Sequence, residues 1–199
     1  MKPIIFLTTI ALVIVANIFA TTSSANDRWR TVRNLEFKFH YLYPADWSEG
    51  RITVSNIRSV VTSGTIRNHG NCNVLVAEKP SPYTRNELKA DLESRPFTID
   101  DWKNTLGPTM IDLTILARKK AKLGKWPAQE ALMEYRLDSP KGEMLFYRTI
   151  TVLTVTPGRF WQLSCIAAGQ SFPQARAAFD YQANTFRKII NSFEFDWVI

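Results

Sequence analysis

The chain has 199 residues, of which 45% are hydrophobic and 22% are charged, with 25 Lys and Arg against 18 Asp and Glu. This composition is that of a globular protein, because the hydrophobic content is too high for a disordered chain with so small a charge imbalance. Two cysteines are too few for a disulfide-stapled miniature scaffold or for a four-thiolate zinc site.

The first 25 residues have the pattern of a secretory signal peptide. Lys2 supplies the positive start, residues 4–19 form an apolar stretch, and Ser23-Ser24-Ala25 offers a small-residue cleavage site. A membrane anchor is the alternative, but a helix that spans a bilayer needs about 18 consecutive apolar residues, and this stretch is shorter and interrupted by polar residues. We therefore predict cleavage after Ala25 and a periplasmic or secreted protein with no further transmembrane segment.

The basic excess belongs to the mature part of the chain, because Lys2 is the only charged residue before the predicted cleavage site. For an exported protein we do not expect a nucleic acid partner. An acidic protein surface or an anionic polymer of the envelope remains accessible to a basic protein outside the cytosol. The alternative is that the positive charge only keeps the protein soluble.

Export also decides how Cys72 and Cys165 are interpreted. Thiols pair in oxidising compartments, whereas in the cytosol they stay reduced. We therefore predict a Cys72–Cys165 disulfide, which in the chain-entropy account would stabilise the fold by about 4–5 kcal/mol. Two separately buried thiols that behave as small apolar residues are the alternative.

The N-terminal part of the mature chain is predicted to hold an arm and several strands. Residues 26–34 are polar and rich in arginine, which indicates a flexible basic arm, and a single α+β domain is expected over residues 35–199 because no repeat or linker divides them. From Leu35 to Tyr43 aromatic and polar residues alternate with the period of a half-buried strand, which Pro44 ends. Further strands are expected over residues 52–55, 60–63 and 73–78.

Two short helices are expected next. Thr84 and Glu87 have the spacing of a capping box, so a helix should run from Arg85 to about Ser94. A second helix should begin near Thr98 and carry Trp102 on its apolar face.

The second half of the chain is predicted to form consecutive hairpin strands. Turn residues at 124–127 and 139–142 divide residues 111–156 into three strands, and a return strand over residues 160–168 follows the Pro-Gly turn at 157–159. Neighbouring hairpin strands of this kind favour an antiparallel sheet.

A long C-terminal helix is predicted to cross that sheet. Ser171 is placed to cap it, and its apolar residues recur at helical intervals: Ala175, Phe179, Phe186, Ile190 and Phe193. We expect this stripe to seal the sheet and to form one continuous hydrophobic core with it.

Motifs that would indicate a reaction are absent from the sequence. The hydrolase motifs G-x-S-x-G and H-E-x-x-H, the P-loop and the dinucleotide glycine motif do not occur. His40 and His69 lie in polar contexts where structural roles are expected, and Asp100 and Asp101 stand at a predicted helix start, where carboxylates stabilise the helix dipole. The sequence predicts no catalytic residue, no metal ligand and no cofactor.

The densest charge cluster of the chain lies over residues 118–125. In a strand, alternate residues project to the same side, so this cluster would form a basic stripe. The predicted turn that follows adds a lysine and an exposed tryptophan, and the candidate interaction surface therefore comprises Arg118, Lys120, Lys122, Lys125 and Trp126. This surface would dock an acidic partner, unless its lysines serve only to discourage edge-to-edge aggregation.

Two stretches of the chain carry a family resemblance. An aromatic strand that ends in Tyr-Pro covers residues 37–44 and is followed by Trp47, and residues 157–163 lead to a helix that finishes over residues 186–193. These stretches resemble the opening strand, last strand and closing helix of the PsbP/Mog-like superfamily, which is typified by the PsbP subunit of photosystem II and the Mog-type Ran-binding proteins and includes exported bacterial members. The resemblance implies an α+β fold with an antiparallel sheet between helices.

The resemblance also implies a protein that binds other proteins and has no chemistry of its own. We therefore expect a non-enzymatic exported binding module that acts on an envelope or secreted protein as an assembly factor, an adaptor or an inhibitor. Two alternatives stay open at this point. One is a carrier of a small molecule or lipid in a pocket between sheet and helix, and the other is an unrecognised small hydrolase.

Overall fold

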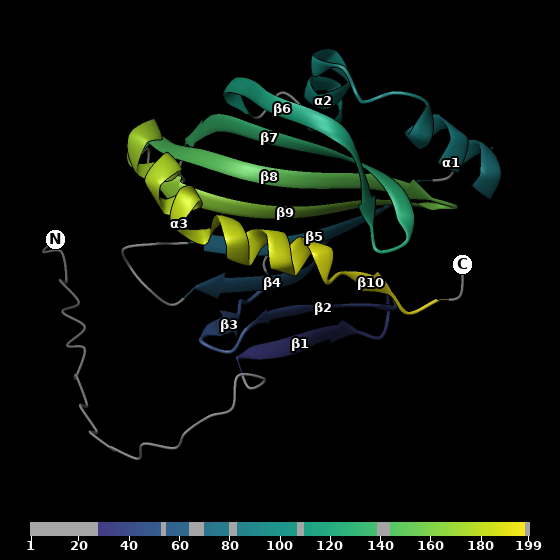
Figure 1. The fold of residues 1–199 in the computed structure, drawn as a ribbon, viewed down its shortest axis with the longest axis horizontal. Coiled ribbons are helices and arrows are strands. Elements are labelled where there is room, and N and C mark those ends of the chain that lie inside the picture. Colours follow the sequence, from purple (N-terminus) through teal and green to yellow (C-terminus); the bar gives the residue numbers. More distant parts are fainter. Residues whose placement is uncertain are drawn as a thin grey trace, which may run out of the picture.

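The structure is a computed structural model that describes residues 28–52, 55–63, 70–79, 83–106, 110–138 and 144–197 (Figure 1). The predicted signal peptide, its cleavage site and His69 lie outside the described residues. Within them, no helix combines the length and apolar character that crossing a bilayer requires.

Two antiparallel sheets and three helices make up the described part of the chain. The larger sheet has the order β3-β4-β5-β9-β8-β7-β6 and the smaller one the order β1-β2-β10. The strands are β1 (Trp29–Asn34), β2 (Phe39–Pro44), β3 (Trp47–Glu49), β4 (Ile57–Ser63), β5 (Gly70–Glu78), β6 (Ile111–Leu123), β7 (Trp126–Asp138), β8 (Met144–Thr156), β9 (Arg159–Gly169) and β10 (Glu194–Phe195). The helices are α1 (Arg85–Ser94), α2 (Ile99–Leu106) and α3 (Phe172–Asn191).

This architecture confirms the predicted α+β class, an antiparallel sheet with a long C-terminal helix across it (Figure 1). The capping box of α1 is present, because the Thr84 hydroxyl accepts from the Glu87 amide and the Glu87 carboxylate accepts from the Thr84 amide. The predicted disulfide is present as well. Cys72 and Cys165 lie directly opposite each other on β5 and β9 with their sulfurs 2.09 Å apart.

Three predictions for the N-terminal part are wrong. Residues 29–34 were expected in a flexible basic arm, but they form β1, which pairs along its whole length with β2 and buries Val32. The alternating pattern that starts at Leu35 begins the strand too early, because residues 35–38 form the turn between β1 and β2, with Lys38 at φ 56°. No strand begins at Ile52, which is exposed.

α3 covers one face of the larger sheet, and β2 of the smaller sheet packs against the same helix. The core between them is aromatic and aliphatic, and Phe186 and Phe193 are fully buried in it. Gly70 on β5 makes room for the helix, since a Cβ there would stand 3.0 Å from the Phe186 ring. Burial of one such side chain contributes about 1.5–3 kcal/mol. This interface is therefore packed with side chains where the carrier alternative would place a pocket.

The opposite face of the sheet carries a second hydrophobic cluster. Trp102 of α2 packs there with Ala131, Met133 and Tyr135 of β7 and Leu153 of β8. Successive residues of a strand point to opposite faces, so β7 contributes to both clusters, with Ala128 on the α3 side. The expectation of one continuous core is wrong for this reason, since a sheet buried on both faces separates its interior into two.

Two buried carboxylates on β7 connect that strand to α3. Glu134 accepts two hydrogen bonds from Arg176, at 2.8 and 2.7 Å, and forms an ion pair with Arg148 of β8 at 3.2 Å. Glu130 pairs with Arg187 of α3 at 2.7 Å. The hydrogen bonds from Arg176 lower the pKa of the Glu134 carboxyl below its ordinary value. Burial alone would raise that pKa, but its effect is smaller.

Candidate interaction surfaces

The predicted basic stripe lies on β6, an edge strand of the larger sheet. Arg118, Lys120 and Lys122 are exposed and alternate along the strand, so they share one side. Lys119 points to the other side, where its ammonium group lies 3.3 Å from the Glu130 carboxylate. The structure thus brings Arg118, Lys120 and Lys122 together on the side that faces α1.

Lys120 has a structural partner. Its Nζ donates a hydrogen bond of 3.1 Å to the Glu93 carbonyl oxygen, near the C-terminal end of α1. The last turn of α1 contains no basic residue, so Lys120 supplies from β6 the positive charge that a helix C-terminus favours. The stripe that is left for a partner consists of Arg118, Lys122 and, in the turn after β6, the exposed Lys125.

A shallow cavity of about 370 Å³ lies between the stripe and the end of α1. Its walls combine two lysines, one glutamate and apolar groups, namely Leu92, Glu93, Lys120, Ala121, Lys122 and Pro127. Among the described residues, no carboxylate forms an ion pair with Arg118, Lys122 or Lys125. Their positive charge is therefore available to a partner.

Trp126 does not belong to this surface. The sequence predicted an exposed residue in a turn, but the turn is only Gly124-Lys125, with Gly124 at φ 57°, and Trp126 begins β7 and is 0% exposed. Its Nε1 donates to the Val155 carbonyl at 3.0 Å, and its ring contacts Trp197 with centroids 6.0 Å apart. The burial depends on a C-terminal residue that is distant in sequence, which is why the local pattern did not reveal it.

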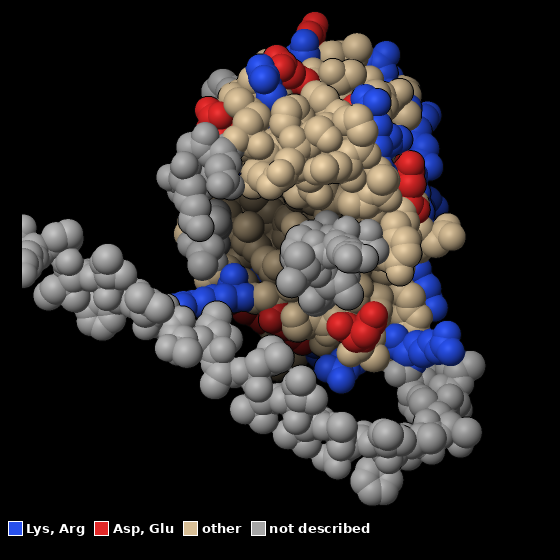
Figure 2. Space-filling view, turned by 90° about the vertical axis from the view of Figure 1, so that its left-hand side faces the viewer, with Lys and Arg blue, Asp and Glu red and all other residues tan. Residues whose placement is uncertain are grey.

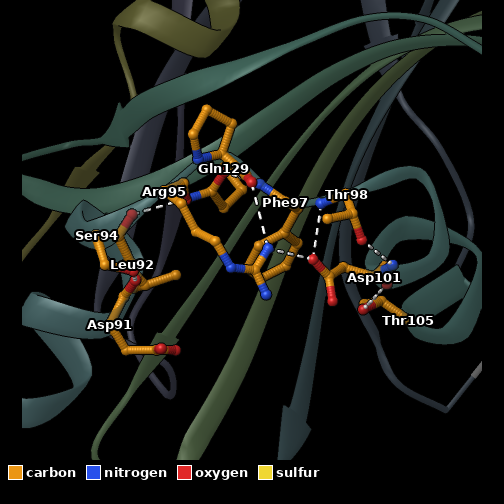
Figure 3. Close-up of polar contacts among 10 residues, drawn as sticks. Asp91, Leu92, Ser94, Arg95, Phe97, Thr98, Asp101, Thr105 and Gln129 are labelled. Atoms are coloured by element: carbon orange, nitrogen blue, oxygen red, sulfur yellow. Dashed lines mark hydrogen bonds and ion pairs between the residues drawn. The ribbon is translucent and has the colours of Figure 1, made fainter.

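The side chain of Gln129 links the end of α1 and the α1–α2 connection to the sheet by hydrogen bonds (Figure 3). Gln129 of β7 donates from Nε2 to the carbonyls of Leu92 at 2.7 Å and Arg95 at 3.1 Å, and its Oε1 accepts from the Phe97 amide at 2.9 Å. Gln129 is 1% exposed. A single buried amide thus satisfies one backbone group in the last turn of α1 and two in the connection that follows, as buried polar groups require.

Asp101 organises the start of α2 (Figure 3). Its Oδ2 accepts from Arg95 Nη1 at 2.6 Å and from the Thr98 amide at 2.7 Å. These hydrogen bonds, the one from Arg95 foremost, hold the pKa of the Asp101 carboxyl well below its ordinary value. The helix-start role that the sequence predicted for this carboxylate is therefore present. A polar cavity of about 280 Å³ lies beside it.

A further cavity of about 320 Å³ combines cations with aromatic rings, and no sequence pattern predicted it. We call it the cationic groove. It is lined by Glu36, Lys38, Arg85, Thr156, Pro157, Arg159, Trp161 and Trp197. These residues come from the β1–β2 turn, the start of α1, the β8–β9 hairpin and the C-terminal end. Only the Pro-Gly-Arg turn stood out in the sequence, since the rest assemble from distant segments.

The aromatic floor of the cationic groove is fixed by packing. Trp161 is 0% exposed, and its Nε1 donates to the Thr156 hydroxyl at 2.8 Å. Phe195 stands between the two tryptophans, with ring centroids 4.9 Å from Trp161 and 4.8 Å from Trp197. Trp161 itself has no accessible surface, but the partly exposed ring of Trp197, held in this way, offers a contact surface at little cost in conformational entropy.

His40 has a structural environment. Its Nδ1 is hydrogen-bonded to the Asp196 carboxylate, which also accepts from Arg33 at 3.1 Å. Within the described ranges, no group of three or more His, Cys, Asp and Glu side chains is arranged to hold a metal ion. The carboxylates on β7 are likewise engaged with arginines of α3, so these titratable groups connect elements of the fold.

Positive charge is distributed unevenly over the surface. In the end-on view of Figure 2, Lys and Arg side chains gather mainly along one flank, and uncharged side chains cover the middle of the molecule. Acidic side chains also occur on that flank, but the basic ones are in excess there. An excess of positive charge next to uncharged surface is suited to steering and orienting a partner of opposite charge.

Comparison with known proteins identifies the fold. No protein-family model and no curated protein matches the chain. Solved structures do match. Cyanobacterial PsbP (CyanoP) from Synechocystis sp. PCC 6803 has a TM-score of 0.52 and 15% identity, over 88% of this chain and 98% of that chain. The Ran-binding protein Mog1p of Saccharomyces cerevisiae has a TM-score of 0.51 and 10% identity, over 84% of this chain and 95% of that chain.

The chain has the PsbP/Mog-like fold. In this PsbP/Mog-like structure the aromatic strand that carried the resemblance is β2, whose Phe39 and Tyr41 are fully buried beside α3. Those residues account for the fold and not for a site. The candidate surfaces, by contrast, consist of residues outside that strand, and identities of this size transfer no function to them.

Proposed function

We propose that the mature protein is a non-enzymatic, exported binding module that recognises an acidic surface on another protein of the envelope or extracellular space. The observation that carries the proposal is the basic stripe on β6. Arg118, Lys122 and Lys125 have no ion-pair partner among the described residues, and Lys122 lines a cavity of about 370 Å³. Exposed cations around a partly apolar depression favour docking of a complementary acidic surface.

Two further features support export and protein binding. The N-terminal segment has the pattern of a signal peptide, and the Cys72–Cys165 disulfide is the form that paired cysteines take in an oxidising compartment. A Ran-binding protein shares the fold, which is an analogy at the level of the fold.

The edge position of β6 suggests a competing purpose for the same lysines. A strand edge offers unpaired backbone groups to other strands, and lysines together with bulges prevent such pairing. β6 has register irregularities between Ile111 and Thr114 and between Ile115 and Ala117, so its first half is already protected. The cations lie on the regular second half. If they were only protective, their reversal would leave the affinity for a partner unchanged, because glutamates also protect a strand edge.

The test is the double variant Arg118→Glu/Lys122→Glu. Crosslinking in the native envelope identifies the partner bound by the unaltered protein, and binding is then measured with purified components at several salt concentrations. We expect the dissociation constant to rise at least about tenfold, with a smaller salt dependence, because two charge contacts become repulsive.

The matched control is Arg51→Glu/Lys103→Glu, which makes the same change in net charge at exposed positions outside the stripe. This variant should bind the partner as the unaltered protein does. Equal affinities of the two double variants would contradict a docking role for the stripe.

A further inference from the structure

We infer that the cationic groove is a second docking site, which takes an acidic peptide segment of a partner protein. The inference rests on the proposed function only in assuming that the occupant is a protein. It concerns residues that the stripe does not share, so the two proposals can be tested separately.

The charge of the groove defines the chemistry of its occupant. Lys38, Arg85 and Arg159 line it against one acidic residue, Glu36. Among the described residues, none of these three cations pairs with a carboxylate. Guanidinium groups bind carboxylates through two parallel hydrogen bonds, which is the strongest and most directional polar contact available at a protein surface.

Aromatic rings orient the arginines before any partner arrives. The guanidinium carbon of Arg159 lies 5.2 Å from the centroid of the Phe37 ring, and that of Arg85 lies 5.8 Å from the Trp126 ring. Cation–ring contacts of this kind hold the side chain and leave its N–H groups free to donate. The cost of ordering these side chains on binding is therefore reduced.

The tryptophans add an apolar contact at the centre. Trp161 is fixed by its hydrogen bond to Thr156, and Trp197 lies between the rings of Phe195 and Trp126. Trp161 is fully buried and supports the site from below, so the contact itself comes from the partly exposed Trp197. An aromatic contact with charged groups around it is the arrangement in which a few residues carry most of the binding energy.

The size of the groove favours a short segment. Its volume of about 320 Å³ is at the lower end of the range for ligand sites. A few side chains fill such a space. The occupant that fits both volume and charge is a segment with carboxylates on either side of one aromatic or branched apolar residue.

The test uses the purified mature protein and two labelled hexapeptides. The acidic probe has the sequence Asp-Glu-Trp-Asp-Glu-Leu, and the neutral probe replaces each acid by its amide. Fluorescence anisotropy measures both dissociation constants. We expect the acidic probe to bind at least about tenfold more tightly than the neutral one, because each charge-assisted contact exceeds its neutral counterpart.

Arg85→Glu is the most informative variant. Arg85 is exposed at the first position of α1, where a carboxylate stabilises the helix dipole, and Lys89 remains 4.8 Å from the Trp126 ring. The variant should therefore fold and weaken binding of the acidic probe by about tenfold or more. Arg159→Gln gives a second test without charge reversal, and Arg51→Glu is the control with unchanged affinity.

The inference would be overturned if the two probes bound equally well, or if Arg85→Glu and Arg51→Glu had equal effects. It would also be overturned if inorganic phosphate displaced the acidic probe at comparable concentration, or if the protein bound phosphatidylglycerol vesicles in preference to the peptide. The last two results would assign the groove to a small anion or to a membrane surface.

The stripe variant Arg118→Glu/Lys122→Glu separates this inference from the proposed function. It should bind the acidic probe as the unaltered protein does. If the probe does not bind while the envelope partner still depends on the stripe, the groove inference fails and the proposed function stands. If the probe binds the groove but the stripe variant still binds the envelope partner, the proposed function fails and the groove inference stands.

Discussion

The two faces of the larger sheet are covered in different ways. On one face, α3 buries seven residues over its length and adds arginine contacts to β7. On the other, α1 buries Leu88 and Leu92, α2 buries Trp102, and their connection depends on Gln129. The first face is stabilised by many overlapping contacts and the second by few. The basic stripe and its cavity lie beside the lightly attached helices, where an adjustment on binding costs least.

Truncation of a fully buried phenylalanine of α3 should give the largest loss of stability. Phe186 is fully buried against Trp47 and Phe179, with Gly70 below its ring. Phe186→Ala creates a cavity in a region that has no room to collapse, and we expect a loss of about 3–5 kcal/mol in the free energy of unfolding. Urea denaturation measures it, with Phe186→Leu as the milder control. A loss below about 1 kcal/mol would contradict the dense packing of this face.

The second face should respond locally and by less. Gln129→Leu leaves the carbonyls of Leu92 and Arg95 and the Phe97 amide without their partner, for which we expect a loss of about 1–3 kcal/mol. Amide hydrogen exchange should accelerate in α1 and α2 and stay unchanged in α3. Gln129→Glu keeps an acceptor for the Phe97 amide and loses the two donated bonds. A uniform acceleration over the whole chain would show that the two faces are not independent.

The same contrast explains how much of the fold could be predicted from sequence. The limits of α1 and the disulfide follow from local or compartment-level signals, a capping box and two cysteines in an exported chain. The start of α3 follows from its serine cap, whereas the helix ends at Asn191, before Phe193, the last residue of the predicted stripe. Each of these signals is contained within a few residues or depends on a single pair.

The wrong predictions share a different cause. β1 was taken for an arm because Arg30 and Arg33 conceal a strand whose stability comes from pairing with β2. Trp126 was expected to be exposed because its burial depends on Trp197 and α1. The cationic groove, assembled from four separate segments, has no signature at all within any one of them. Features that tertiary contacts create were missed, and those that local chemistry creates were found.

The smallest expected effect is the loss of stability at low pH, when a carboxylate near each face of the sheet becomes protonated. The pKa of Asp101 is held below its ordinary value of 3.8, mainly by the hydrogen bond from Arg95, and that of Glu134 below 4.5, mainly by the one from Arg176. A lowered pKa in the folded state means that each contribution to stability is complete above the ordinary value. It is lost as the pH falls below that value towards the lowered pKa.

Acid and salt should therefore distinguish the two ion pairs. The Arg95–Asp101 pair is exposed on both sides, with side chains 59% and 33% accessible, whereas Glu134 is only 4% accessible. Salt screens exposed pairs more than buried ones. The Thr98 amide resonance reports the titration of Asp101, and the Arg176 guanidinium resonance reports that of Glu134. We expect added salt to shift the first titration and to leave the second nearly unchanged. Asp101→Asn should abolish the titration at Thr98 alone. Equal salt sensitivity at both sites would contradict the difference in shielding between the two ion pairs.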